Sequence, residues 1–114
     1  MSVIVYHNPR CSKSRCALEY LNERKVDFIV VEYIKEPFTK EGLESLLHQL
    51  SLSPLDLIRK NEPEFKEYFS RNQVSNELAI EAMLRFPKLI ERPIVVKDGK
   101  AIVARPTELI EELL

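Results

Sequence analysis

The sequence has few cysteines, almost no net charge and no metal-binding pattern. Its 114 residues include two cysteines, which is too few for the disulfide framework of a small secreted domain. The spacing Cys-x4-Cys lacks the further histidine or cysteine ligands of a zinc site, so we expect no metal. Seventeen Lys and Arg residues against eighteen Asp and Glu residues leave a formal net charge of −1. This balance predicts neither nucleic acid nor an anionic membrane as a partner.

Long hydrophobic runs are also missing. No run approaches the roughly 20 residues that span a bilayer, and no basic leader precedes a long apolar stretch. Internal repeats, low-complexity segments and linkers are absent from the sequence. At 45% hydrophobic residues the chain can build one core, so we expect residues 1–114 to form a single domain of a cytoplasmic protein.

The most informative stretch is YHNPRCSKSR, from Tyr6 to Arg15. The apolar, β-branched run Val3–Tyr6 predicts a buried strand, His7–Arg10 predicts a turn, and a helical pattern begins at Ser12. Cys11 therefore lies at a strand-to-helix junction. The free N–H groups and the dipole at a helix N-terminus favour an anion, so the pKa of the Cys11 thiol is expected to lie below the ordinary value of about 8.5.

A reactive Cys11 has a simpler alternative. Free cysteines usually behave as small buried hydrophobic residues, and this is the alternative interpretation of Cys11. However, a core cysteine belongs on an apolar stripe, whereas Cys11 has Asn8, Arg10, Ser12 and Lys13 as neighbours. This position favours a catalytic or redox role, and the same N–H groups are suited to hold an oxyanion.

Several neighbours of Cys11 are candidates for supporting roles. His7 as an imidazolium would favour the thiolate, but a structural histidine at the strand end fits the sequence equally well. Ser12, Ser14 and Arg15 can turn hydroxyl, backbone and guanidinium groups toward an anion, although Ser12 can equally be an ordinary first helical residue. The Asn8 side chain is expected to cap the turn.

The second cysteine, Cys16, falls five residues after Cys11 in the predicted helix. Five residues rotate a helix by about 500°, which puts the two side chains about 140° apart around its axis. We therefore expect no working disulfide between them, and we expect Cys16 to be a buried packing residue. An external thiol must then complete any redox cycle at Cys11.

The remaining pattern predicts an α/β fold. Ser12 to about Arg24 is an amphipathic helix, and Asp27–Ile34 is a mostly apolar strand expected to be buried on both faces. These segments and the first strand form a βαβ unit with parallel strands. A helical insertion follows at about residues 39–86, in which Thr39, Ser53 and Ser75 are the expected N-caps.

The C-terminal third returns to strands. Ile94–Lys97 and Lys100–Ala104 flank Asp98-Gly99, which is a strong hairpin signal. A closing helix is expected from Glu108 to Leu114, with Leu109, Ile110 and Leu113 facing inward and Glu111 and Glu112 solvated. The whole order is that of a thioredoxin-like fold with a mixed four-stranded sheet. Arg92 and Arg105 lie at the same end of the hairpin, because its strands are antiparallel.

Several short motifs together resemble the glutaredoxin-coupled arsenate reductase family. They are His7-Asn8-Pro9-x-Cys11-x-x-Ser14-Arg15, Arg59-Lys60, Arg92-Pro93-Ile94 and Arg105-Pro106. The resemblance implies that Cys11 attacks arsenate and that Arg59, Arg92 and Arg105 bind the oxyanion. It further implies glutathione as co-substrate, glutaredoxin as the protein that removes the glutathione, no bound cofactor, and a cis peptide before Pro93. Without the resemblance, each arginine would be an ordinary surface ion-pair residue.

Two other functions fit parts of the sequence. A regulatory branch of the same superfamily binds RNA polymerase, but it typically carries Cys-x-x-Cys, whereas this chain has Ser14 at the second position. A glutathione-dependent thiol-transfer protein without an arsenate substrate is the other alternative. Arg10 and Cys16 also differ from the best-known arsenate reductases, so the substrate itself needs a direct test.

Overall fold

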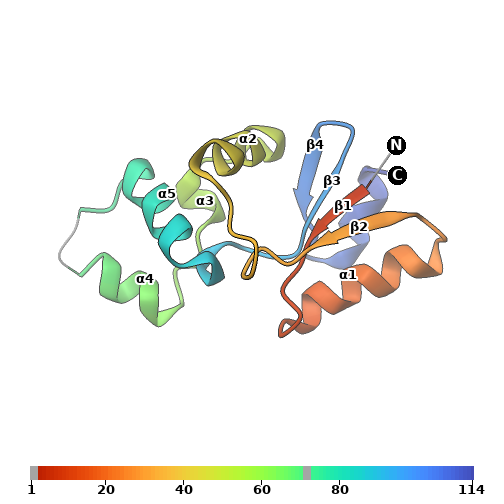
Figure 1. The fold of residues 1–114 in the computed structure, drawn as a ribbon, viewed down its shortest axis with the longest axis horizontal. Helices are drawn as coiled ribbons and strands as arrows, with labels where there is room; N and C mark the ends of the chain where they lie inside the picture. Colours follow the sequence, from red (N-terminus) through yellow and green to blue (C-terminus); the bar gives the residue numbers. More distant parts are fainter. Residues whose placement is uncertain (1–2, 71–72) are drawn as a thin grey trace. The chain divides into compact units, whose positions relative to one another are not determined.

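The computed structural model describes residues 3–70 and 73–114, and the chain divides into two compact units. The sheet unit contains the residues up to Glu36 and Arg92–Leu114, and the helical unit is Pro37–Glu91. The sheet unit holds β1 (Val3–Tyr6), α1 (Ser12–Glu23), β2 (Phe28–Val31), β3 (Ile94–Lys97), β4 (Lys100–Val103) and the 3-10 helix η2 (Thr107–Glu112) (Figure 1). The helical unit holds α2 (Lys40–Leu50), α3 (Pro54–Leu57), α4 (Pro63–Tyr68), α5 (Asn76–Arg85) and the 3-10 helix η1 (Pro87–Leu89).

The sheet has four strands in the order β2-β1-β3-β4. β1 pairs with β2 in parallel, and it pairs with β3 antiparallel, with Val5 opposite both Val30 and Val95. β3 and β4 form an antiparallel hairpin. The sheet is therefore mixed, as the sequence predicts, and the fold is the thioredoxin-like fold.

One face of the sheet packs on α1 and η2 (Figure 1). Alternate β1 residues point to this core, because successive side chains of a strand lie on opposite faces. The apolar face of α1 supplies Ala17 and Leu21, both fully buried, and η2 supplies Ile110. This packing fixes the N-terminus of α1 beside the carboxyl end of β1.

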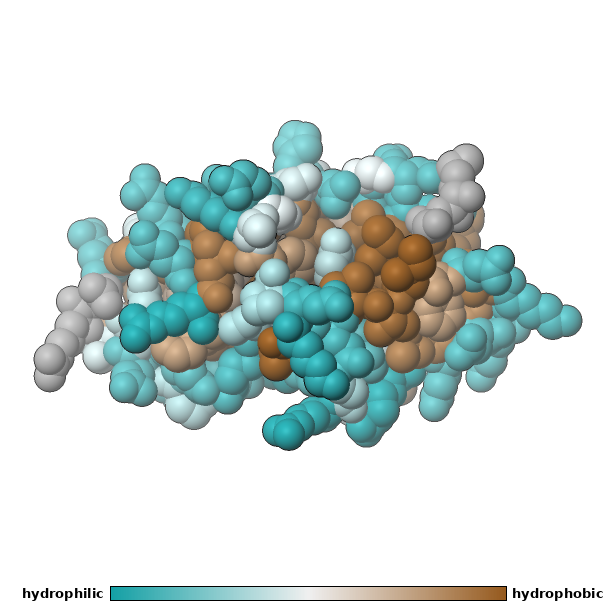
Figure 2. Space-filling model, in the orientation of Figure 1, coloured by the Kyte–Doolittle hydropathy of each residue, from teal (hydrophilic) through white to brown (hydrophobic). Residues whose placement is uncertain are grey.

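The prediction for the second strand was partly wrong. β2 covers only Phe28–Val31, and Ile29 and Val30 are 54% and 40% exposed. Figure 2 shows apolar surface where Figure 1, in the same orientation, labels β2. The sheet order explains this, because β2 is an edge strand with a neighbour on one side only. An apolar run looks the same in a central and an edge strand, so the sequence did not distinguish them.

The predicted hairpin is confirmed. Its turn has positive φ at both central residues, 52° at Asp98 and 78° at Gly99, as a two-residue hairpin turn requires. The Arg92–Pro93 peptide is cis, as the family resemblance implies, and the Arg105–Pro106 peptide is cis as well. Both arginines thus come directly before a cis proline.

The closing segment differs from its prediction. It forms a 3-10 helix over Thr107–Glu112, with Ile110 buried and Leu109 and Leu113 partly buried. Glu111 is not simply solvated, because it accepts a hydrogen bond from Tyr20 Oη at 2.7 Å and forms an ion pair with Arg24. These contacts fasten η2 to α1.

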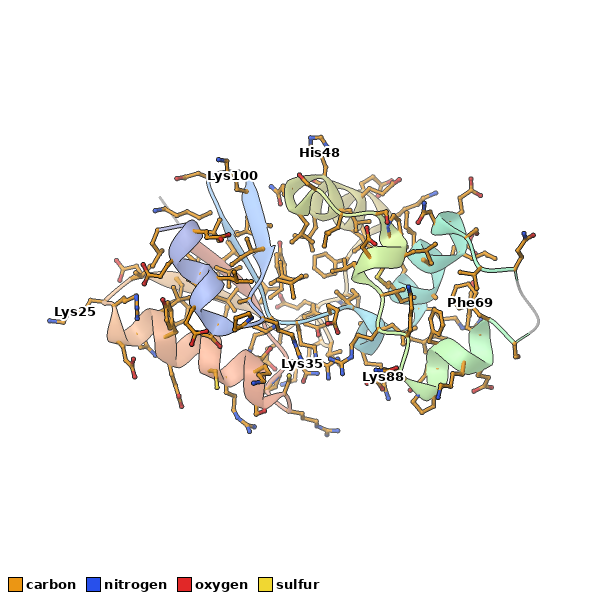
Figure 3. All side chains as sticks on the ribbon, turned by 180° about the vertical axis from the view of Figure 1, so that it is seen from behind. Lys25, Lys35, His48, Phe69, Lys88 and Lys100 are labelled. Carbon is orange, nitrogen blue, oxygen red and sulfur yellow. The ribbon has the colours of Figure 1, made fainter. Side chains whose placement is uncertain are left out.

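The helices α2, α3 and α5 begin at the predicted caps. Thr39 Oγ1 accepts the N–H of Gly42 at 3.0 Å, and Ser75 Oγ accepts the N–H of Leu78 at 3.2 Å. Ser53 forms a capping box with Asp56. His48 lies on the exposed side of α2 (Figure 3).

The buried face of α5 consists of Ala79, Ala82 and Met83. Leu78, Ile80 and Leu84 of the same helix are only partly buried. No helix among residues 3–70 and 73–114 is long and apolar enough to cross a membrane.

Candidate active site

The loop between β1 and α1 is held by a set of local hydrogen bonds. Asn8 Oδ1 accepts the N–H of Arg10 at 3.1 Å, which confirms the expected side-chain cap of the turn. Asn8 O accepts the N–H of Cys11 at 3.0 Å, and Arg15 Nη1 donates to Pro9 O at 3.0 Å. The loop thus has a defined path that delivers Cys11 to the start of α1.

Ser14 contributes its backbone N–H to the Cys11 thiolate and uses its hydroxyl elsewhere. Its side chain is fully buried, and Ser14 Oγ accepts the N–H of Asn8 at 3.2 Å. The hydroxyl therefore braces the loop instead of facing an anion. The sequence did not show this, because the bond depends on the loop folding back over the first turn of the helix.

Cys11 is the N-cap residue of α1, with extended backbone angles of φ −100° and ψ 121°. Its side chain makes no formal capping hydrogen bond, but the N–H groups of Ser14 and Lys13 favour its thiolate. Burial raises the pKa of Cys11, and the Ser14 N–H, the Arg92 guanidinium and the Lys13 N–H outweigh that effect, so the pKa lies below its ordinary value. The geometry is that of a thiolate held at a helix N-terminus.

Two arginines from the ends of the hairpin face this sulfur. Arg105 Nη2 donates to Cys11 Sγ at 3.6 Å, and Arg92 contributes both a hydrogen bond and its charge to the thiolate. Arg105 Nε also donates to the carbonyl oxygen of Arg92 at 2.6 Å. All three residues are half-buried. The structure therefore brings together the predicted nucleophile and two of its predicted anion-binding partners.

His7 is buried at the end of β1, 6% exposed, and its N–H extends the strand ladder by donating to Val31 O at 2.9 Å. Burial lowers the pKa of His7, while Glu32 raises it and Arg15 lowers it further. The pKa lies below 6.5, so the ring is neutral at pH 7 and supplies no positive charge to the thiolate. Its Nδ1 has no hydrogen-bond partner among the described residues.

Ser12 and Arg15 are both exposed in the first turn of α1. Arg15 is engaged with the loop carbonyl of Pro9, so its guanidinium braces the loop from outside. No group of three or more histidine, cysteine or acidic residues arranged to hold a metal occurs in residues 3–70 and 73–114.

Arg59 belongs to the helical unit, whereas Cys11, Arg92 and Arg105 belong to the sheet unit. Within its unit it is held by two carboxylates, with Nε 3.5 Å from Glu62 Oε1 and Nη1 3.4 Å from Glu91 Oε1. Lys88 Nζ, 3.6 Å from Glu62 Oε2, extends this network. Neither carboxylate was expected from the sequence, although the i, i+3 spacing of Arg59 and Glu62 was a signal that could have indicated the first.

Cys16 was wrongly predicted to be buried. It is exposed, because the inward face of α1 follows Ser14, Ala17 and Leu21 and leaves Cys16 on the outside. Both cysteines are free thiols. The role of Cys16 in packing is therefore excluded, and the prediction that it forms no working disulfide with Cys11 stands for test.

We expect alkylation of Cys11 to report a pKa below the unperturbed value of about 8.5. The rate of iodoacetamide reaction is measured against pH in the Cys16→Ser variant, so that only Cys11 reacts. Thiolate is lost as pH falls through the pKa, so the midpoint of the rate profile should lie below that of an ordinary cysteine. A midpoint at or above the unperturbed value would contradict the thiolate assignment.

Replacing the buried Ser14 by alanine should raise the pKa of Cys11 toward its ordinary value. The Asn8 N–H loses its acceptor, which costs about 1–3 kcal/mol of stability and loosens the loop that positions the sulfur. The same alkylation profile and a urea titration measure both effects. Ser12→Ala, at an exposed position of the same turn, is the matched control, and equal profiles for the two variants would refute the bracing role.

Comparisons with known proteins match this chain over nearly its whole length. The profile of the ArsC family matches residues 6–113. An arsenate reductase of Neisseria meningitidis serogroup A is 40% identical over 112 residues, covering 96% of this chain and 96% of that protein. The uncharacterized protein YfgD of Escherichia coli is 44% identical over 114 residues, covering 98% of this chain and 96% of that protein. The solved structure of an arsenate reductase from Vibrio cholerae has a TM-score of 0.92 and 40% identity, covering 100% of this chain and 98% of that one.

Proposed function

Since the chain belongs to the ArsC family, we propose that it is an arsenate reductase that uses Cys11 as its nucleophile and depends on glutathione and glutaredoxin. The observation that carries this proposal is the placement of Cys11 at a helix N-terminus with Arg92 and Arg105 facing its sulfur. A thiolate and two guanidinium groups in one place suit a reaction with a tetrahedral oxyanion.

Arginine is the suitable residue for binding this substrate. Its planar fork meets two oxygens of a tetrahedral anion at once and stays charged at any working pH. In the half-buried site, the hydrogen bond from Arg105 Nε to the Arg92 carbonyl orients one fork before substrate arrives. Such preorganised charge stabilises an anion more than mobile surface charge does.

The proposed chemistry reduces arsenic by two electrons. The Cys11 thiolate bonds to arsenic, one arsenic–oxygen bond breaks, and the oxygen leaves as water after protonation. The sulfur of glutathione then replaces a second oxygen. A glutaredoxin thiolate then attacks the glutathione sulfur. The bond between arsenic and this sulfur breaks, its electron pair passes to arsenic, and the mixed disulfide of glutaredoxin and glutathione leaves. Overall, arsenate and two thiols give arsenite, one disulfide and water, and hydrolysis frees Cys11.

The remaining groups have supporting parts in this proposal. A neutral His7 is suited to accept a proton near the loop. Arg59 is proposed as a third anion-binding arginine, oriented within the helical unit by Glu62 and Glu91. The need for reduced glutathione favours the cytoplasm as the place of reaction.

A coupled turnover assay tests the proposal. The purified protein is mixed with arsenate, glutathione, glutaredoxin, glutathione reductase and NADPH, and arsenate-dependent NADPH oxidation is followed. We expect turnover that requires all components. In the same mixture without glutaredoxin, turnover of hydroxyethyl disulfide by a protein that does not respond to arsenate would instead identify a thiol-transfer protein. Inactivity toward both would favour the regulatory alternative.

A further inference from the structure

Two basic residues flank Cys11 outside the inner pair of arginines. Arg10 precedes the cysteine and Lys13 follows it in the first turn of α1, and both are exposed. None of the ion pairs between described residues involves either of them. We call Arg10 and Lys13 the outer basic pair.

The outer basic pair opposes the field of its own helix. α1 has no acidic residue in its first turn. A helix dipole favours anions at the N-terminus, where each negative charge contributes about 0.3–1 kcal/mol and a positive charge is unfavourable. Positive charge is thus concentrated where the helix itself is already positive. Such a local conflict is typical of functional sites.

The inner arginines Arg92 and Arg105 face the place of the reacting anion, and the outer basic pair lies outside that place. Arg92 and Arg105 are half-buried and face the Cys11 sulfur, where the reacting anion must lie. Arg10 directly precedes Cys11, Lys13 is the second residue after it, and both are exposed. A ligand bonded to Cys11 through its own sulfur would therefore extend into solvent past these two cations.

We propose that the outer basic pair binds carboxylate groups of the thiol that reacts at Cys11, which selects small thiols that carry negative charge. The inference rests on the proposed function only in requiring that an external thiol react at this cysteine. Arg10 and Lys13 are positioning residues in this account, since they touch the thiol away from the reacting sulfur. Because exposed ion pairs are weak individually, two together should change a rate by about fivefold to tenfold.

The test uses disulfides of different charge, without arsenate. The Cys11 thiolate attacks a symmetric disulfide, forms a mixed disulfide and releases one thiolate. One S–S bond forms as one breaks, and the net charge is unchanged. Glutathione disulfide is anionic and hydroxyethyl disulfide is neutral, and the ratio of their rates measures preference for carboxylates. Mass spectrometry follows the mixed disulfide in the Cys16→Ser background, which leaves Cys11 as the only thiol.

We expect Arg10→Gln with Lys13→Gln to lower this ratio by about fivefold or more, and 0.5 M NaCl to lower it in the parent protein. Lys25→Gln is the matched control, because Lys25 lies at the other end of α1 and extends away from it (Figure 3). An unchanged ratio in the double variant, or an equal fall in the Lys25 variant, overturns the proposal. Since no arsenate is present, inactivity toward arsenate would refute the proposed function and leave this measurement intact.

Discussion

Replacing Cys11 by serine is expected to reduce arsenate turnover by about a thousandfold or more. A serine hydroxyl is not ionised at neutral pH, and it cannot form the sulfur–arsenic bond with which the proposed reaction begins. The stability should change little, because the side chain is only half-buried and makes no formal capping bond. The coupled NADPH assay measures the effect, and a urea titration confirms that the variant is folded.

Cys16→Ser is the matched control for this variant. It removes the same atom from an exposed position of the same helix, so its turnover should equal that of the wild type. If Cys16→Ser were as inactive as Cys11→Ser, a second thiol of this chain would be part of the cycle. If Cys11→Ser kept its turnover, the nucleophile would have been assigned wrongly.

Arg92→Ala and Arg105→Ala should each weaken arsenate or sulfate binding by about 2–5 kcal/mol, which is roughly 30-fold to 4,000-fold. This exceeds the 0–1 kcal/mol or so of an exposed ion pair, because the two guanidinium groups meet the anion in a half-buried site. Arg105→Lys keeps the charge but loses the fork and the bond to the Arg92 carbonyl, so it should recover only part of the affinity. Isothermal titration calorimetry measures all three.

Arg85→Ala provides the control for these variants, since Arg85 is an exposed residue of α5. Its affinity for arsenate should equal that of the wild type, and the thermal midpoints of all variants should agree closely. Arg59→Ala should behave like the other two if the helical unit supplies a third ligand. Normal affinity in all three alanine variants at Arg59, Arg92 and Arg105 would reject the oxyanion site.

The sequence predicted those parts of the site that depend on local signals. β1, the start of α1 and the Asp98-Gly99 hairpin follow from side-chain pattern and turn chemistry, and they match the structure. The convergence of Arg92 and Arg105 followed from the antiparallel hairpin alone. These features require no knowledge of distant contacts.

The errors concern features that depend on the whole fold. Whether an apolar strand is central or at an edge depends on sheet order, which is why Ile29 and Val30 were expected inside. The outward position of Cys16 depends on which α1 stripe meets the sheet, and the bracing bond of Ser14 depends on the loop path. Glu91, whose carboxylate forms an ion pair with Arg59, is remote from it in the sequence, so no local pattern indicates this contact.

The most direct test is whether arsenic bonds to the Cys11 sulfur. X-ray absorption at the arsenic edge is measured on the Cys16→Ser protein frozen with arsenate and without a second thiol, after unbound arsenate is removed. The account predicts a sulfur atom among the nearest neighbours of arsenic, and its disappearance in Cys11→Ser with Cys16→Ser. An arsenic atom surrounded only by oxygen in the protein that retains Cys11 would contradict it.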